Sequence, residues 1–324
     1  GMAMKRADLV EAAEDTFRNS KFDVSMRCVS RPSCFDFAAR RGEVKVLVKV
    51  FWNIGCASSE QVNELRRVAT QLSASPLIIG YKGYRSLLED DVVYSRYGVY
   101  VITLKTLRET LERGMHPLVE AGPGGYYVHI DGEAIRRRRE ELGLSMGRLA
   151  KMLGLSRITV YSYERGRVKA SVKAAYQLSR VLGIPVAKPI NIFHSAPSPE
   201  LSQSSKTQLS SRLHQLVYRK LTQLNLFVDM VNRAPFDFIA HHWMDERRIV
   251  GGVFDGSEVD ASRRASEIAS LAQVVDAYPV LIVDGRFKSL QVSEVPQISH
   301  GELKRMRNHH ELRERLREAV RVQV

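Results

Sequence analysis

Hydrophobic residues follow the same succession of patterns twice along the chain. A strand-like run at 44–51, apolar residues at helical spacing and a short apolar run at 77–79 predict a strand, a helix and a strand. The same succession runs from 248 to 282. The two helical stripes correspond at a constant offset: Val62, Leu65, Ala69 and Leu72 in one, and Ala265, Ile268, Ala272 and Val275 in the other. Since strands alternate with helices, the pattern predicts two α/β units.

A short motif marks the beginning of each unit. Phe35-Asp36-Phe37 recurs as Phe236-Asp237-Phe238, and an Arg and a Pro precede both triplets. An amphipathic helix is expected before each triplet. From the Phe that ends each strand-like run, the next proline lies at the same distance: Phe51 to Pro76 and Phe254 to Pro279. We interpret these correspondences as an internal duplication.

A different pattern lies between the two units, over residues 145–164. Ala150, Gly154, Val160 and Tyr163 have the spacing of a helix-turn-helix, in which a small residue lets two helices cross and a glycine adopts the left-handed backbone of the turn. Helices at 132–142 and 171–182 are expected to complete a four-helix module. The predicted N-caps of the two central helices are Ser145 and Ser156.

This segment closely resembles the Cro and phage-repressor class of helix-turn-helix domains over about residues 131–184. The resemblance includes the Glu-x-Gly ending of the recognition helix, here Glu164-Arg165-Gly166. It implies a structural ion pair between Glu164 and Arg139 of the preceding helix. Met146 departs from the class, because that position is often a glutamine that makes a polar contact.

The recognition helix supplies the candidate DNA contacts, since a helix fits the major groove. Arg157 is expected to bind guanine and Ile158 to touch a thymine methyl group. The full set of expected base contacts is Arg157, Ile158, Tyr161 and Ser162. The expected phosphate contacts, which position the protein without reading sequence, are Ser145, Ser156, Thr159, Arg165, Arg167 and Lys169.

Charge supports a polyanionic partner. The chain has 49 Lys and Arg against 36 Asp and Glu, a formal net charge of +13. More than half of this excess falls within 131–182, where twelve basic residues face five acidic ones. The three cysteines have neither zinc-site nor disulfide spacing, and no apolar run approaches the roughly 18 residues of a membrane span. A soluble, cytoplasmic and nucleoid-associated protein is expected.

The first unit resembles the beginning of a PD-(D/E)XK nuclease, with Asp36 at the position of the first metal-binding acid. The Glu-x-Lys of that superfamily aligns with Lys49-Val50-Phe51, and its second-unit counterparts are Gly252 and Phe254. Magnesium requires carboxylate oxygens, so we expect no metal, no cofactor and no catalytic residue. An ion pair of Lys49 with Asp36 is expected in place of the metal.

The expected architecture is two duplicated α/β nuclease-like domains that flank an all-α helix-turn-helix domain of four to five helices. The boundaries are 1–120 for the first α/β domain, 121–188 for the helix-turn-helix domain, 189–207 for a Pro- and Ser-rich linker and 208–324 for the second α/β domain. This order resembles an archaeal family of helix-turn-helix transcriptional regulators over nearly the whole chain.

The sequence therefore predicts a transcriptional regulator that binds double-stranded DNA sequence-specifically, as a homodimer and without catalysis; no effector is identifiable. One alternative is a metal-dependent nuclease or DNA-processing enzyme that the helix-turn-helix targets to its site. A third possibility makes the module a protein-docking domain. Metal-dependent cleavage separates the first two, and salt-dependent DNA binding excludes the third.

Overall fold

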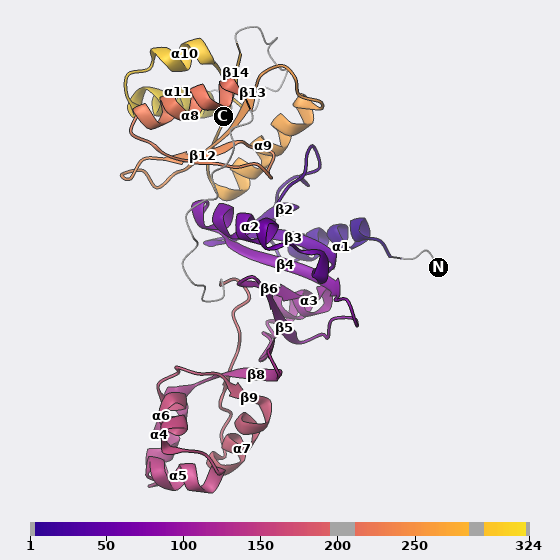
Figure 1. Cartoon of the computed structure of the whole chain (residues 1–324), viewed down its shortest axis with the longest axis vertical. Coiled ribbons are helices and arrows are strands. Elements are labelled where there is room, and N and C mark those ends of the chain that lie inside the picture. Colours follow the sequence, from indigo (N-terminus) through magenta and orange to yellow (C-terminus); the bar gives the residue numbers. More distant parts are fainter. Residues whose placement is uncertain (1–3, 195–210, 285–294, 322–324) are drawn as a thin grey trace.

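The computed structural model describes residues 4–194, 211–284 and 295–321. Three bodies follow one another along its longest axis (Figure 1). The C-terminal α/β unit lies at one end, the N-terminal α/β unit in the middle, and the helical module at the other end. The candidate DNA-binding module is therefore attached to the N-terminal unit alone.

The N-terminal unit is a twisted sheet with helices on both faces. Its strands follow the order β1-β2-β3-β4-β6-β5; β2 and β3 are antiparallel, and β4 is parallel to both β3 and β6. Side chains alternate along β3, so Val46, Val48 and Val50 pack with α1 and α3, whereas Leu47 packs with α2. The elements are α1 (Arg6–Asn19), β1 (Asp23–Val24), β2 (Phe37–Arg41), β3 (Val44–Asn53), the 3₁₀ helix η1 (Ile54–Cys56), α2 (Ser59–Gln71), β4 (Ser75–Lys82), β5 (Val92–Arg96), β6 (Val99–Ile102) and α3 (Leu104–Arg113).

The sheet continues from this unit into the module. β7 pairs in parallel with β5 and forms an antiparallel hairpin with β8, on which the helices of the module are mounted. The described helix boundaries agree closely with the expected 132–142 and 171–182. The elements are β7 (Val119–Gly122), β8 (Gly125–Ile130), α4 (Gly132–Glu141), α5 (Met146–Leu153), α6 (Arg157–Glu164), β9 (Ala170–Ser171), α7 (Val172–Leu182) and β10 (Ala187–Lys188).

After β10, the chain returns to the N-terminal unit. Ile190 and Ile192 are buried in its core, and the backbone N–H of Ile190 donates to the carbonyl of Pro117 at 2.8 Å. The Ser75 hydroxyl donates to the carbonyl of Phe193. The first residues of the expected linker thus pack on the N-terminal unit, and its part from 195 onward lies outside the described residues. The proposed domain boundaries remain a prediction.

The C-terminal unit has the same strand order and directions as the start of the first sheet. In the order β11-β12-β13-β14-β15, two antiparallel pairs are followed by two parallel pairs, as in β1-β2-β3-β4-β6. Helices α8, α10 and α11 cover one face and α9 the other. The elements are α8 (Arg212–Gln223), β11 (Phe227–Met230), β12 (Phe238–His241), β13 (Ile249–Phe254), α9 (Ala261–Val275), β14 (Tyr278–Val283), β15 (Gln297–Ser299), α10 (His300–Arg305) and α11 (His309–Arg321).

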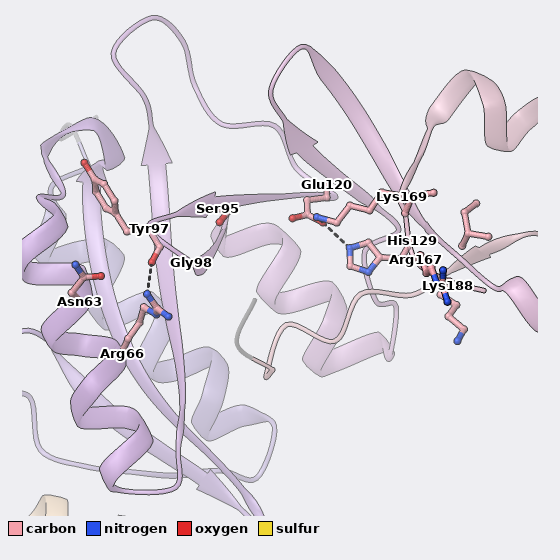
Figure 2. A pocket seen from close by; sticks show the side chains of 13 residues that line it. Asn63, Arg66, Ser95, Tyr97, Gly98, Glu120, His129, Arg167, Lys169 and Lys188 are labelled. Atoms are coloured by element: carbon pink, nitrogen blue, oxygen red, sulfur yellow. Dashed lines mark hydrogen bonds and ion pairs between the residues drawn. The ribbon is translucent and has the colours of Figure 1, made fainter. Parts of the chain in front are cut away.

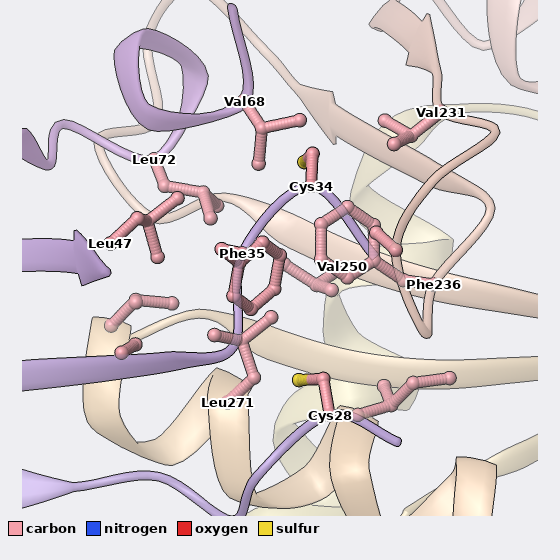
Figure 3. Packing of buried hydrophobic residues seen from close by; sticks show 14 of the residues in the cluster. Cys28, Cys34, Phe35, Leu47, Val68, Leu72, Val231, Phe236, Val250 and Leu271 are labelled. Carbon is pink, nitrogen blue, oxygen red and sulfur yellow. The ribbon is translucent and has the colours of Figure 1, made fainter. Parts of the chain in front are cut away.

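The two α/β units share one apolar core, to which α2 and α9 both contribute. Phe35 and Phe236, which occupy corresponding positions of the repeated triplet, stack there with ring centroids 6.2 Å apart (Figure 3). The cysteines Cys28 and Cys34 lie in the same core as free thiols. The first two cysteines are thus packing residues of the junction between the units.

Reciprocal hydrogen bonds surround this shared core. Glu64 of α2 accepts from the backbone N–H groups of residues 232 and 233, at 3.1 and 3.2 Å. Glu267 of α9 accepts in turn from the N–H groups of residues 29 and 30, at 3.1 and 3.0 Å. Each unit therefore uses a glutamate of its helix to hold the loop before the other unit's Phe-Asp-Phe strand, so these contacts across the junction are reciprocal.

Candidate nucleic-acid interface

Local sequence signals define the recognition helix α6. The Ser156 hydroxyl caps its N-terminus by accepting from the backbone N–H of Thr159 at 3.1 Å. Val160 and Tyr163 are buried in the core of the module, where they pack with Leu149 of α5. These contacts fix the inner side of α6 and leave the other side free for a partner.

The preceding helix and the turn complete the helix-turn-helix. The Ser145 hydroxyl accepts from the N–H of Arg148 at 3.0 Å, which caps α5. Gly154 ends α5 with a φ of 66°, in the left-handed region that favours glycine. Ala150 is buried at the crossing of the helices, as its small size allows. The spacing that predicted the motif thus corresponds to definite backbone and packing roles.

The N-terminal half of α6 presents two of the four expected base-contact residues, Arg157 and Ile158. Ile158 is 77% exposed although it is apolar, and Arg157 is exposed beside it. Arg157 has no carboxylate partner among the described residues. Tyr161 and Ser162 lie farther along α6 and are half-buried. An uncompensated guanidinium next to an exposed aliphatic side chain can bind a guanine edge and a thymine methyl group.

Arginine side chains border α6 at its C-terminal end. The guanidinium carbons of Arg165 and Arg167 lie 5.2 and 5.8 Å from the centroid of the Tyr161 ring. Cation–π contacts at this distance orient a guanidinium without neutralising its charge. Thr159, another expected phosphate contact, has its hydroxyl 2.7 Å from that of Ser156. Both arginines remain exposed and available to phosphates.

Lys169 differs from the other expected phosphate contacts because it already has an anionic partner. Its Nζ lies 2.8 Å from the carboxylate of Glu120 on β7, and His129 Nε2 lies 2.6 Å from the same oxygen. Burial raises the pKa of Glu120, but the hydrogen bonds from His129 and Lys169 more than offset this and lower the pKa below its ordinary value. Lys169 therefore ties the module to β7.

Arg139 and Glu164 join the first and third helices of the module. Arg139 Nε donates to Glu164 Oε1 at 2.9 Å, and its Nη1 donates to the carbonyl of Leu144 at 2.8 Å. The two side chains are 10% and 5% exposed. The contact is close because α4 begins at Gly132, where a Cβ would lie 2.3 Å from the carbonyl oxygen of Glu164. No pattern in the sequence indicated this steric requirement for glycine.

The acid of the first nuclease-like unit is held by an arginine. Asp36 Oδ1 lies 2.6 Å from Arg6 Nη2, and its Oδ2 accepts from the N–H of Val50 at 2.7 Å. Lys49, the expected partner, also forms an ion pair with Asp36, at the longer distance of 3.9 Å, and donates to the carbonyl of Ser33. Since Arg6 lies 30 residues before Asp36, only the tertiary structure reveals this partner.

The corresponding acid of the second unit is more completely enclosed. Asp237 pairs with Arg264 of α9 and with Arg31, which reaches it from the N-terminal unit at 3.1 Å. His214 Nε2 lies 3.1 Å away. Burial alone would raise the pKa of Asp237, but these partners outweigh it and lower the pKa to about 2. Of these partners of Asp237, a sequence pattern marked only Arg31, which precedes the first Phe-Asp-Phe triplet.

These residues do not fit a magnesium ion. A Cβ at Gly252, the position aligned with the missing acid, would lie 2.8 Å from the side chains of Ile268 and Phe254. No group of three or more metal-ligating side chains occurs in the described ranges. The neighbouring histidines make separate ring contacts: His241 stacks on Phe227 at 5.2 Å and His242 on His309 at 3.8 Å. Among the described helices, none has the length and apolar character that crossing a membrane requires.

Comparison with known proteins supports both parts of this description. A PD-(D/E)XK superfamily domain profile matches residues 6–117, and a helix-turn-helix profile matches residues 135–188. Proteins named "Putative HTH-type transcriptional regulatory protein" are similar over most of the chain. The one from Methanocaldococcus jannaschii is 31% identical, with 99% of both chains covered. The one from Thermococcus kodakarensis is 33% identical, with 95% of both chains covered. The one from Archaeoglobus fulgidus is also 33% identical, with 86% of this chain and 87% of the relative covered.

Proposed function

The chain belongs to the archaeal family of HTH-type transcriptional regulatory proteins, and on this premise we propose that it regulates transcription by binding specific double-stranded DNA sequences. The observation that carries the proposal is the exposed pair Arg157 and Ile158 at the beginning of α6. α6 enters the major groove with this pair toward the base edges. Tyr161 and Ser162 contact bases farther along the helix.

The remaining polar groups of the module hold the DNA backbone. Arg165 and Arg167 contact phosphates beyond the C-terminal end of α6, and Ser145, Ser156 and Thr159 contact them near the helix N-termini. Lys169 joins them only when a phosphate displaces the Glu120 carboxylate. The ion pair of Arg139 and Glu164 is structural, because both side chains are nearly buried and face the core of the module.

We further propose that the α/β units have no nuclease activity. Support comes from Asp36 and Asp237, whose carboxylates are held by arginines, and from Gly252, which leaves no space for a second acid. A cationic guanidinium at a carboxylate opposes the binding of a metal cation. The units serve instead as a scaffold. We attribute their matching strand order and shared core to a duplication.

A homodimer of the chain is part of the proposal, as is action at the nucleoid without an identified effector. Two copies of α6 would then read half-sites about one helical turn, roughly 34 Å, apart. Since α2 and α9 are already buried between the two α/β units, a second chain docks elsewhere. Light scattering and footprinting test this: a monomer that protects a single unrepeated site would contradict the dimer.

Selection of bound duplexes from a random-sequence pool tests the proposed function. Enrichment of a shared sequence, with binding that weakens as salt rises, is expected. Enrichment of no sequence would contradict specific recognition. Absence of any salt-dependent binding would instead favour a protein-docking module.

A further inference from the structure

A cleft of about 930 Å³ separates the N-terminal unit from the helical module. One wall comes from α2 and the β5–β6 turn, where Arg66 and Tyr97 lie. The other wall comes from β8, the segment after α6 and β10, where Figure 2 shows His129, Arg167 and Lys188. One wall belongs to the N-terminal unit and the other to the helical module, so the cleft lies between these two bodies.

The charge of the cleft is strongly positive. Four of its lining residues are Arg66, Arg167, Lys169 and Lys188, against the single acid Glu120. Glu120 already binds Lys169 and His129. Within the described ranges, no carboxylate lies within ion-pair distance of any of the other three cations. The cleft therefore holds three positive charges that lack a counterion.

The Arg66 guanidinium is held in place although no carboxylate pairs with it in the described ranges. Its Nη1 donates to the carbonyl of Tyr97 at 3.2 Å, in the tight turn where Tyr97 and Gly98 both have positive φ. A Cβ at Gly98 would lie 3.2 Å from the guanidinium carbon, so the glycine permits this approach. Burial lowers the pKa of Arg66. A partly desolvated and fixed guanidinium without a carboxylate is well suited to an anion from outside.

The cleft is continuous with the candidate DNA-binding surface. Arg167 lines the cleft, and its guanidinium lies 5.8 Å from the ring centroid of Tyr161 on α6. A DNA backbone held by Arg167 at the end of α6 is therefore adjacent to the cleft. Lys188 faces the same space from β10 (Figure 2).

We propose that this cleft binds phosphate groups of the DNA that flanks the sequence read by α6, with Arg66 and Lys188 as the contacting cations. The proposal rests on the proposed function and extends the DNA-binding surface onto the N-terminal unit. A free phosphorylated compound has the same chemistry, but the continuity through Arg167 favours the DNA backbone. The N-terminal unit then fixes the orientation of the module on DNA.

Duplexes of two lengths test the proposal: one limited to the selected sequence and one extended by about ten base pairs on each side. In the Arg66→Gln, Lys188→Gln double variant, affinity for the long duplex should fall roughly tenfold near physiological salt, because two phosphate contacts are lost. The salt slope for the long duplex should become shallower by about 2. Affinity for the short duplex should not change.

Three controls keep the outcomes distinct. Arg66→Lys retains the charge and should bind the long duplex nearly as the unmodified chain does, and the exposed Arg219→Gln on α8 should have no effect. Thermal melting shows whether the double variant is folded. The same comparison of long and short duplexes is repeated with random sequences, because the phosphate contact does not depend on sequence. The proposed sequence recognition is contradicted by a different result, namely that the unmodified chain prefers no sequence.

Equal weakening on both duplexes, or no weakening on either, would overturn the proposal. It would also be overturned if pyrophosphate bound the unmodified chain without DNA and lost this binding in the double variant while the affinity for the long duplex stayed the same. That result would assign the cleft to a free phosphorylated compound. A loss confined to the long duplex supports the flanking-DNA contact.

Discussion

Arg31 of the N-terminal unit donates from its guanidinium to the carboxylate of Asp237 in the C-terminal unit, at 3.1 Å. The same guanidinium donates to the backbone carbonyls of Ala234 and Phe236. Asp237 is thus part of the junction between the two units. The buried acid of the second Phe-Asp-Phe triplet contributes to the assembly of the two α/β units.

The stability of this junction should depend on acid pH. The pKa of Asp237 is about 2 in the folded chain, whereas its ordinary value is 3.8. The ionised carboxylate therefore stabilises the folded chain fully only when the pH is above this ordinary value. This contribution, on the order of 2 kcal/mol, is lost as pH falls from about 4 toward 2. We expect the difference in free energy of unfolding between the unmodified chain and Asp237→Asn, measured with urea, to shrink over this range. A difference that does not change with pH would contradict the assignment.

Glu164→Ala should loosen the helix-turn-helix module. The change leaves Arg139 nearly buried without its partner and should lower the stability of the module by about 3 kcal/mol. Glu140→Ala is the matched control, because Glu140 pairs with Arg136 at 3.2 Å on an exposed face and contributes no more than about 0.5 kcal/mol. Thermal melting measures both variants. Equal melting temperatures for the two would remove the proposed structural role.

Incubation with magnesium or manganese should leave duplex and branched DNA intact, even at high protein concentration. Metal-assisted phosphodiester hydrolysis needs clustered acids that hold the cation, whereas the Asp36 carboxylate forms an ion pair with Arg6 here. Gel electrophoresis of end-labelled substrates gives the readout. Asp36→Ala should lower only the melting temperature. Cleavage that requires metal and disappears in this variant would establish an enzyme instead.

The sequence predicts those features that depend on neighbouring residues. The caps Ser145 and Ser156, the turn at Gly154 and the buried positions of α6 follow from helical period and backbone preference. The strand succession of the two units follows from apolar runs at matching spacing. Such signals are local, so each is complete within a few residues of the printed sequence.

Side-chain partners that are distant in sequence could not be predicted in the same way. Arg6 and Arg264 reach their acids from helices whose charge pattern resembles an ordinary solvated surface. The pair of Lys169 with Glu120 depends on how β7 and β8 join the module to the first sheet. The cleft at Arg66 exists only because the chain leaves the N-terminal unit and returns to it.

Replacement of single arginines tests the central claim most directly. By titration of the selected duplex and a random-sequence duplex, Arg157→Ala should weaken specific binding by about 1 to 3 kcal/mol, relax the preference at one base pair and leave non-specific binding unchanged. Arg167→Ala should weaken binding to both duplexes alike and reduce the salt slope by about 1. Arg219→Ala, distant from the module, should match the unmodified chain. If Arg157→Ala retains full affinity and sequence preference, or if both module variants lose specific and non-specific binding equally, α6 does not read DNA in the way described.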